Sequence, residues 1–362
     1  MSLEAFYFDA RYIRVSHHDG ISRFSVGLFA AISKLTSVTA IISDLRQLEK
    51  LPSGTKWVML NDPTSISEPL IAYKLNRLGA KVVFSPMQTI GSFGRKFKLA
   101  VTLHDLIYYR HPTPPPSFNL AIRILWRLYH LSYWPQRLLL NRSDVVITVS
   151  KATKKLITLH KLTRKRTEVV YNAASSLVEL QRLATPGSRP AEKQTLVYMG
   201  SFMPYKNVET LIAATGQLQS FELQLLSKID DARRAELQSL ADSFGAKVTF
   251  FNGVSDEQYD QLLNQAVALV SASKDEGFGI PLVEAMARGI PVVVSNIDIF
   301  KEIGGDAAIF CSPEGPDDFA EGIRSLQGND AWLAKSAAAK AQAKKFTWDE
   351  SAAKLYRVLT EL

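Results

Sequence analysis

The sequence contains a single cysteine, Cys311, so no disulfide can form within the chain, and a reducing compartment is favoured. No apolar run approaches the roughly 18 residues of a membrane-spanning helix, because arginines interrupt the longest one, Leu120–Leu140. The first residues, MSLEAFYFDARYIR, lack the charged start and apolar stretch of a secretory signal. We therefore expect a cytoplasmic protein that can touch a membrane, on its inner face, without crossing it.

Metal-binding and nucleic-acid-binding motifs are also missing. No Asp-x-Asp pair occurs, and no Cys and His residues have the spacing of a zinc site. We therefore expect no metal and no cofactor other than the substrates. The sequence has no helix-turn-helix, zinc-finger or RNA-recognition signature, so we expect no nucleic-acid partner.

The bulk composition predicts a globular chain with two domains. A length of 362 residues exceeds one ordinary core, and 46% of the residues are hydrophobic. The net charge is +8. This excess has two interpretations, an anionic partner such as a nucleotide or an acidic membrane surface, or a solubilising surface.

Short β-branched runs alternate with helical patterns along the whole chain. This alternation predicts an α/β fold with two Rossmann-like, doubly wound domains, each built on a parallel sheet covered on both faces. Ligands in such folds bind beyond the carboxyl ends of the strands, so we expect a site in a cleft between the domains. The expected strands are Ala5–Phe8, Val38–Ser43, Trp57–Leu60, Lys81–Phe84, Leu99–Leu103, Val145–Val149, Glu168–Tyr171, Thr195–Met199, Glu222–Leu226, Lys247–Phe251, Ala268–Ser271, Pro291–Val294 and Ala307–Cys311.

Turn-forming residues mark the expected domain boundaries. The N-terminal domain covers 1–183, a linker 184–194, and the C-terminal domain 195–343. The last segment, 344–362, predicts a helix that Thr347 caps in a capping box with Glu350.

One stretch, Ser273–Gly289, combines two carboxylates with a glycine-rich loop. Glu276 and Glu284 are separated by seven residues. Pro281 suits the first position of a helix that ends at Gly289, which places Glu284 in its first turn and Glu276 in the preceding loop. Carboxylates beside the amides of a helix start suit a sugar joined to a nucleoside diphosphate.

This stretch, with "FFNGVSDEQYDQLL" before it, "GIPVVVSN" after it and "FTWDESAAKLYRVL" near the end, resembles the retaining glycosyltransferases of family 4. The resemblance covers nearly the whole chain and implies the GT-B fold, with the last helix crossing back to the N-terminal domain. It implies a retaining hexosyltransferase that moves a sugar from a nucleotide diphosphate sugar to a glycan or a lipid-linked acceptor. Our first guess for the donor is GDP-mannose.

The resemblance implies roles for the residues of this stretch. Glu276 is expected to accept hydrogen bonds from sugar hydroxyls as a catalytic residue, and Glu284 to bind the ribose hydroxyls. The remaining donor-binding residues expected in this stretch are Gly277, Phe278, Gly279, Ile280 and Leu282.

A second glycine-rich turn, "GSFMPYKN", contains Gly200, Ser201 and Lys206. The family's lysine at this place neutralises the leaving diphosphate, so Lys206 is expected to be catalytic, with Gly200 and Ser201 at the donor. The family usually has an arginine nearby, where this chain has Ser201 or Tyr205. Arg23 is a candidate replacement.

The N-terminal domain contributes two further resemblances. "HHDGISRFS" resembles the family's first glycine-rich loop, in which Gly20 touches the diphosphate, although Ser22 stands where a second glycine is common. "VTLHDLIYYRHP" leads from a strand to His104, which we expect to contact the transferred sugar, and to Asp105, which orients the loop or meets the acceptor.

A basic aromatic segment, 118–134, has two interpretations. It is an amphipathic helix at an anionic membrane surface, or a core helix with its arginines at the rim. Two other functions are also open, a non-catalytic module that binds nucleotide sugars or nucleic acid, and a phosphorylase with a GT-B fold.

Overall fold

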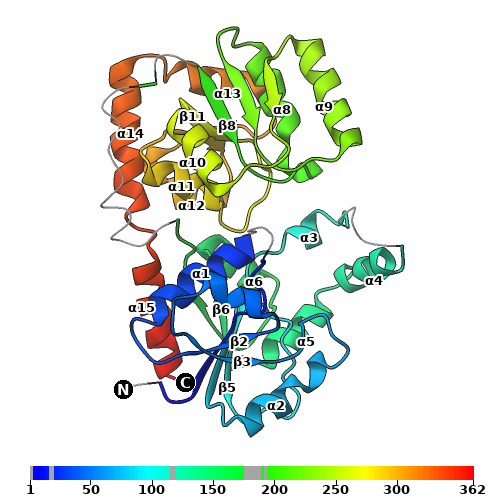
Figure 1. Cartoon of the computed structure of the whole chain (residues 1–362). Coiled ribbons are helices and arrows are strands. Elements are labelled where there is room, and N and C mark those ends of the chain that lie inside the picture. The colour runs from blue at the N-terminus through cyan, green and yellow to red at the C-terminus, as the bar shows by residue number, and fades with distance from the viewer. Residues whose placement is uncertain (1–2, 16–19, 115–119, 175–188, 191–193) are drawn as a thin grey trace. The chain divides into compact units, whose positions relative to one another are not determined.

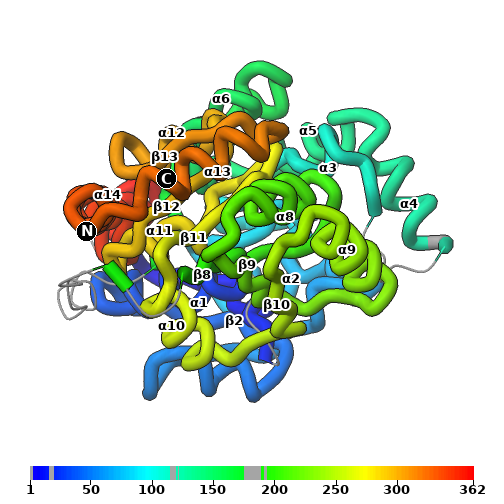
Figure 2. Tube along the Cα trace, turned by 90° about the horizontal axis from the view of Figure 1, so that it is seen from above, coloured from blue at the N-terminus to red at the C-terminus, as the bar shows by residue number. Residues whose placement is uncertain are grey.

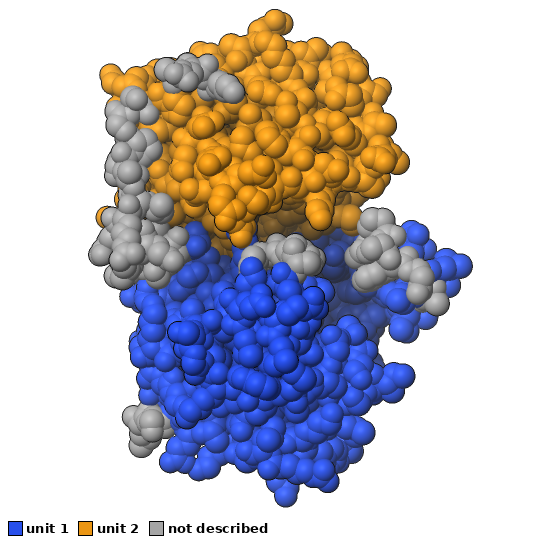
Figure 3. Space-filling model, viewed as in Figure 1, with its two compact units in different colours: residues 1–176, 347–362 blue, residues 177–346 orange. Residues whose placement is uncertain are grey.

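The computed structural model describes residues 3–15, 20–114, 120–174, 189–190 and 194–362. The chain forms two compact units, coloured separately in Figure 3. Unit 1 comprises residues 1–176 together with 347–362, and unit 2 comprises residues 177–346. Of the expected linker, residues 184–188 and 191–193 lie outside the described residues.

Each unit is built on one parallel sheet. The seven strands of unit 1 follow the order β3-β2-β1-β4-β5-β6-β7, and the six of unit 2 the order β10-β9-β8-β11-β12-β13. The bounds are β1 Phe6–Asp9, β2 Thr39–Ile42, β3 Lys56–Met59, β4 Val82–Ser85, β5 Lys98–Leu103, β6 Val145–Thr148, β7 Arg166–Val169, β8 Thr195–Tyr198, β9 Glu222–Leu225, β10 Val248–Phe250, β11 Ala268–Ser271, β12 Val292–Ser295 and β13 Ile309–Cys311.

All of the expected strands are present, which confirms the α/β class and the two Rossmann-like units. In each sheet the first strand lies in the interior, and the chain winds outward from it in both directions. The winding reverses between β1 and β4 in unit 1 and between β8 and β11 in unit 2. Such reversal points open a crevice at the carboxyl ends of the strands, where open α/β sheets bind ligands.

Helices connect the strands of both sheets (Figure 1). In unit 1 they are α1 Gly20–Ile32, α2 Ile71–Arg77, α3 Ile107–Arg110, α4 Leu120–His130, α5 Trp134–Asn141, α6 Lys151–Leu159 and α15 Trp348–Thr360. In unit 2 they are α8 Val208–Gly216, α9 Asp231–Phe244, α10 Asp256–Asn264, α11 Ile280–Ala287, α12 Asp298–Gly304, α13 Pro316–Arg324 and α14 Asn329–Ala343. Short 3-10 turns include η1 Leu45–Lys50, η2 Glu68–Leu70, η3 Pro204–Lys206 and η4 Gly305–Ala307.

The last helix, α15, packs against α1 within unit 1, although the two are far apart in the sequence. Gly27 makes this contact possible, because a Cβ there would lie 2.2 Å from the Trp348 ring. The Thr347 hydroxyl accepts a hydrogen bond from the backbone N–H of Glu350, the first half of the expected capping box. The Ser351 hydroxyl donates to the Tyr171 carbonyl and joins the helix to the end of the sheet.

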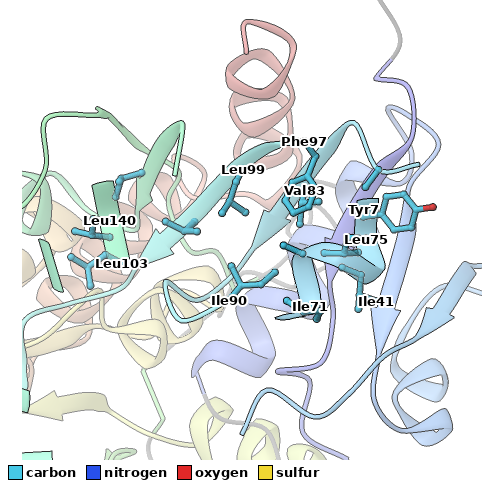
Figure 4. Packing of buried hydrophobic residues seen from close by; sticks show 14 of the residues in the cluster. Tyr7, Ile41, Ile71, Leu75, Val83, Ile90, Phe97, Leu99, Leu103 and Leu140 are labelled. Atoms are coloured by element: carbon cyan, nitrogen blue, oxygen red, sulfur yellow. The ribbon is translucent and has the colours of Figure 1, made fainter. Parts of the chain in front are cut away.

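One part of the core of unit 1 lies where α2 covers the sheet. Figure 4 shows Tyr7, Ile41 and Val83, from three strands of the sheet, near Ile71 and Leu75 from α2. Near-continuous apolar strands of this kind require cover on both faces.

Unit 2 has helices on both faces of its sheet. Helix α8 contacts α9 and α13, whereas α11 contacts α12 and α14, and Figure 2 shows these neighbours from a second direction. Among the described residues, no helix is both long enough and apolar enough to cross a membrane.

Candidate active site

Two loops of unit 2 meet at the reversal point of its sheet. One leaves β8 and runs through Gly200 to η3, and the other leaves β11 and runs to the start of α11. The backbone N–H of Lys274 donates a 2.8 Å hydrogen bond to the Tyr205 carbonyl and ties the loops together. The sequence predicted both loops, and the sheet order is the reason that they are neighbours.

Lys206 and Glu276 form an ion pair between these loops. Lys206 Nζ lies 2.5 Å from Glu276 Oε1, and the Ser273 hydroxyl donates to the same oxygen at 3.0 Å. Both side chains are largely but not fully buried, with 13% and 15% of their surface exposed. Lys206 Nζ also lies 5.3 Å from the centre of the Tyr205 ring, whose π face favours a cation. The pair thus presents one positive and one negative group to a ligand at the sheet edge.

The β8 loop is held in shape by contacts around Gly200. The backbone N–H of Gly200 donates to the Ser227 hydroxyl at 3.1 Å, and the Tyr198 hydroxyl donates to the Ser201 carbonyl at 2.6 Å. A Cβ on Gly200 would lie 2.8 Å from the Tyr198 hydroxyl oxygen, so the glycine is required by packing. Burial raises the pKa of Tyr198, which keeps its hydroxyl a donor.

The β11 loop turns into α11 at Gly279, which has a φ of +91°. A side chain there is strained, and its Cβ would lie 3.0 Å from the Phe300 ring. The helix begins at Ile280, so the helical positions predicted for Pro281 and Glu284 were each wrong by one residue. Pro281 is the second helical residue, and Glu284 is the fifth and lies beyond the first turn, because the backbone enters the helix one residue before the proline.

Glu284 is nevertheless held in a defined position. Only 8% of its surface is exposed, and the Tyr259 hydroxyl of α10 donates to Glu284 Oε2 at 3.0 Å. Sequence reasoning missed Tyr259, although it lies inside one of the stretches that resembled the family. The helix ends, as expected, just before Gly289, which has a φ of +72° and donates its N–H to the Met286 carbonyl.

The other expected donor residues of this stretch differ in what they can offer. The side chains of Phe278 and Leu282 are buried, and Phe278 packs edge-on against Phe346 of unit 2 at 5.8 Å between ring centres. Their backbone groups and side-chain edges are therefore what a ligand can reach. Gly277 is buried as well, and Ile280 starts the helix whose first N–H groups face the loop.

The residues at the expected arginine positions do not supply a second cation. Ser201 is exposed, and Tyr205 lies beneath Lys206. Arg23 lies on α1 in unit 1, so its predicted role in phosphate binding stays a prediction. Within unit 2, sequence reasoning missed Arg233 of α9, which forms ion pairs with Glu209 at the start of α8 and with Glu236.

In unit 1, His104 and Asp105 follow β5 at its carboxyl end. His104 Nε2 lies 2.7 Å from the Pro86 carbonyl, which can only accept, so this nitrogen carries the proton. The Phe24 ring meets the imidazole edge-on at 5.1 Å. Asp105 Oδ1 accepts a hydrogen bond from the backbone N–H of Ile107 and orders the start of α3.

The first glycine-rich loop lies partly outside the described residues, since 16–19 are not among them. Gly20 is the exposed first residue of α1. Ser22, which stands where the family often has glycine, is buried, and its hydroxyl accepts from the backbone N–H of Arg14. This bond accounts for a serine at that position.

A buried charge network lies just after β1, where no sequence pattern predicted one. Arg11 Nε donates to Asp9 Oδ1 at 2.8 Å, and its Nη1 donates to Glu68 Oε2 at 2.7 Å. Burial alone would lower the pKa of Arg11, but the two carboxylates raise it well above its usual value. Gly91 donates its N–H to Glu68, and a Cβ on it would overlap the Glu68 carbonyl at 1.9 Å. The network braces the chain that leads from β1 toward α1.

Comparison with known proteins identifies the family. The family model "Glycosyl transferases group 1" matches residues 183–346, and the model "Glycosyltransferase Family 4" matches residues 57–175. This chain is a family 4 glycosyltransferase. The glycosyltransferase is 25% identical over 329 residues to the O-antigen chain mannosyltransferase RfbU of Salmonella typhimurium, a match that covers 85% of this chain and 87% of that protein.

Solved structures support the GT-B fold of the glycosyltransferase. A sucrose-phosphate synthase from Thermosynechococcus elongatus superposes with a TM-score of 0.72 at 17% identity, over 98% of each chain. Anabaena Alr3699/HepE in complex with UDP and glucose gives 0.71 at 18% identity, over 99% of each chain.

The basic aromatic segment of the glycosyltransferase divides into an exposed helix and a packed one. On α4, aliphatic side chains that include Ile124 and Leu125 are exposed, so the core-helix interpretation was wrong for α4, whereas α5 buries Leu140 in the core. Figures 1 and 2 show α4 at the periphery of unit 1, away from its sheet. Of the described aromatic residues in this segment, Trp126 packs on Tyr108, and only Trp134 is largely exposed.

Proposed function

We propose that this glycosyltransferase transfers a hexose with retention of configuration from a nucleotide diphosphate sugar to a glycan or a lipid-linked acceptor, without a metal ion. The observation that carries the proposal is the Lys206–Glu276 pair at the reversal point of the unit 2 sheet. A cation for phosphate and a carboxylate for sugar hydroxyls are held side by side, which matches the two halves of the donor.

Lys206 provides the electrostatic part of the reaction. Negative charge grows on the diphosphate as its bond to the sugar breaks, and a fixed cation beside it stabilises the transition state. Because Lys206 is held by Glu276 and Tyr205, little reorganisation is needed when the charge appears. The N–H groups at the start of α11 add partial positive charge beside Gly279.

Glu276 and Glu284 provide the orienting part. Glu276 accepts hydrogen bonds from sugar hydroxyls, and Glu284, positioned by Tyr259, accepts from the ribose hydroxyls. The chain thereby fixes both ends of the donor around the bond that breaks.

The bond changes follow from retention. The bond between sugar C1 and the phosphate oxygen breaks, and a bond between C1 and an acceptor oxygen forms on the same face. The acceptor hydroxyl proton passes to the departing phosphate, which is the base nearest to that face. His104 Nε2 already donates to Pro86, so His104 acts through contact with the sugar rather than as a base at that nitrogen.

Mannose from GDP-mannose is the proposed donor. The support is the similarity to the mannosyltransferase RfbU and to the O-antigen chain mannosyltransferase B of Escherichia coli, at 27% identity over 70% of this chain. A transfer assay with GDP-mannose and UDP-glucose, with and without EDTA, tests donor and metal together. We expect turnover with GDP-mannose that EDTA leaves unchanged. Binding of a nucleotide sugar without turnover would instead favour a non-catalytic module.

The stereochemical outcome needs its own measurement. Proton NMR of the product shows whether the anomeric configuration of the donor is kept. An inverted product would contradict the proposed retention while leaving the transferase assignment in place.

We also propose that α4 contacts an anionic membrane surface. Most of its exposed aliphatic side chains follow a helical spacing, which gives one face an apolar stripe, although Ile122 lies off it. The same helix contains Arg123 and Arg127 but no acidic residue. The stripe consists of Leu120, Ile124, Leu125 and Leu128, followed by Leu131 after the helix.

Vesicle sedimentation tests this contact with a matched control. Leu125 on α4 and Leu159 at the end of α6 are equally exposed, at 67%. We expect Leu125→Ser to weaken binding to vesicles of phosphatidylglycerol and phosphatidylcholine, and Leu159→Ser to leave it unchanged. Equal effects of the two variants would contradict a specific role for α4.

A further inference from the structure

An open pocket of about 970 Å³ lies in unit 1, away from His104 and Asp105. It is formed by α5, α6 and the loop that leads into β7. That loop enters β7 at its amino end, whereas His104 follows the carboxyl end of β5. Because the strands are parallel, the pocket and His104 lie at opposite ends of the strands.

The side chains around this pocket are strongly biased in charge. Five of the ten lining residues are basic and none is acidic. Across the part of the chain that the structure describes, none of these five forms an ion pair with a carboxylate. The five basic residues, here called the basic pocket residues, are Arg137, Lys154, Lys161, Arg164 and Lys165.

The surrounding sequence concentrates this charge. Residues 106–167 contain 12 Lys or Arg and one acid, Asp144, an excess larger than the net charge of the whole chain, +8. Asp144 is itself paired with Arg95, outside this stretch. Like charges gathered around one concavity repel each other, so their arrangement is stabilised when an anion binds among them.

The pocket is also ordered by α5. Arg137 donates to the carbonyls of His160 and Lys161, at 2.9 Å and 3.2 Å. Asn141 Oδ1 accepts from the Thr163 hydroxyl and from the backbone N–H of Arg164. The loop that carries three of the basic pocket residues is therefore fixed against α5 before any ligand binds.

Lys161 occupies a backbone position that normally favours glycine. It has a φ of +49° just after α6, where its N–H donates to Thr158 and that of Leu162 donates to Ile157. A residue with a Cβ in this conformation costs roughly 1 kcal/mol relative to glycine. The negative end of the helix favours a cation at Lys161, but this effect does not extend to Lys154, which lies near the other end of α6. Helix stability therefore does not account for the whole set.

We propose that the basic pocket residues bind a phosphate group. Arginine and lysine are the usual ligands of phosphate, and the guanidinium of Arg164 together with the ammonium groups of Lys154 and Lys161 provides donors from more than one side. Lys154 and Ile157 are three residues apart on α6 and share one of its faces, and Lys161 follows the end of the helix at the same pocket, so Ile157 forms an apolar floor between two cations. The phosphate comes from a lipid head group or from a soluble phosphate ester.

Two neighbouring lysines of α6 provide a matched test. Lys154 lines the pocket, whereas Lys155 does not, and the substitution to glutamine removes the same charge from each. Calorimetric titration with inorganic pyrophosphate is expected to show binding that Lys154→Gln weakens about tenfold and Lys155→Gln changes less than about twofold. Binding at the Lys206 loop is common to both variants and cancels in the comparison.

Lys161→Asn separates a structural role from a binding role. Asparagine tolerates positive φ, so the variant is expected to keep or raise the melting temperature while it weakens pyrophosphate binding. A lower melting temperature with unchanged binding would overturn the role assigned to Lys161.

A second arm identifies the source of the phosphate. Sedimentation with phosphatidylcholine vesicles, with and without phosphatidylglycerol, is repeated for Lys154→Gln and Lys155→Gln. Loss of vesicle binding in Lys154→Gln alone supports a lipid phosphate, whereas pyrophosphate binding that depends on Lys154 without such a loss supports a soluble phosphate ester. Equal behaviour of the two variants with both probes overturns the proposal, because it shows only a diffuse effect of charge.

Discussion

Lys206 Nζ lies 2.5 Å from Glu276 Oε1, across two loops that are 70 residues apart in the sequence. Only the order of the sheet makes this contact possible, since β8 and β11 are neighbours at its reversal point. Each charge compensates the other, which offsets part of the desolvation cost of burying the pair. A donor that binds here places phosphate beside Lys206 and sugar hydroxyls beside Glu276, so both groups gain a polar partner without separating from each other.

The first prediction concerns this pair and uses a second pair from the same loop as its control. Lys274 and Glu314 are also joined by an ion pair, at 2.7 Å, but are more exposed. Lys206→Gln and Glu276→Gln are expected to lower kcat about 100-fold or more, because each removes a group that acts on the transition state. Lys274→Gln and Glu314→Gln are expected to leave kcat within about threefold. Steady-state assays measure kcat for the four variants, and circular dichroism checks that each is folded. A Glu276→Gln variant that keeps its activity would refute the assignment.

The second prediction concerns the position of Glu284. Tyr259→Phe removes one hydrogen bond to Glu284 and leaves the ring in place. We expect the dissociation constant of the nucleotide to rise about fivefold, the value of one hydrogen bond of about 1 kcal/mol, with kcat unchanged. Titration calorimetry with nucleoside diphosphate measures it. A fall in kcat without a change in affinity would show that Glu284 acts on the reacting sugar rather than on the ribose.

The third prediction concerns the buried network of unit 1. Arg11→Met leaves Asp9 and Glu68 as buried carboxylates without their cation, and we expect a loss of about 3–5 kcal/mol in the free energy of unfolding. Arg46, whose ion pair with Asp44 is on the surface, is the control, and Arg46→Met is expected to change stability little. Urea unfolding followed by circular dichroism compares the two. Equal stability of both variants would show that the network is compensated by water.

The fold and part of the site could be predicted from the sequence because the strands are short, apolar and bounded by turns. The runs before Gly200 and before Ser273 indicated both strands and both loops of unit 2. The position of Glu284 could not be fixed, because Pro281 is equally acceptable at the first or second helical position. One residue of difference moves the carboxylate by more than a quarter of a turn.

Long-range polar contacts were beyond the reach of local patterns. Nothing near Arg11 in the sequence points to Glu68, and nothing near Glu284 points to Tyr259, since each pair is joined only by tertiary packing. The basic pocket could not be predicted from the sequence for a related reason. The excess of Lys and Arg was visible, but its concentration around α6 requires the positions of α5 and of the loop before β7.

The last prediction concerns Cys311, the only thiol of the chain. Burial, with Asp318 and Glu321 nearby, raises the pKa of the thiol to about 12. An exposed thiol has a pKa of about 8.5, so at about pH 8 the native protein holds very little of the reactive thiolate. We expect a disulfide reagent such as DTNB to label Cys311 far more slowly in the native protein than in the urea-unfolded chain. As urea is added, the labelling rate is expected to rise in proportion to the fraction of unfolded protein.

The same shift determines the pH dependence of stability. Above about pH 8.5 the unfolded thiol loses its proton while the folded thiol keeps it, so the folded state binds more protons and stability falls as the pH rises toward about 12. Cys311→Ala removes this contribution, and its stability is expected to fall less steeply than that of the natural chain over this range. Rapid labelling of the native protein at about pH 8, or identical slopes of stability against pH for the two chains, would show that the thiol is accessible to solvent. Such access would require β13 to open locally at the edge of the unit 2 sheet.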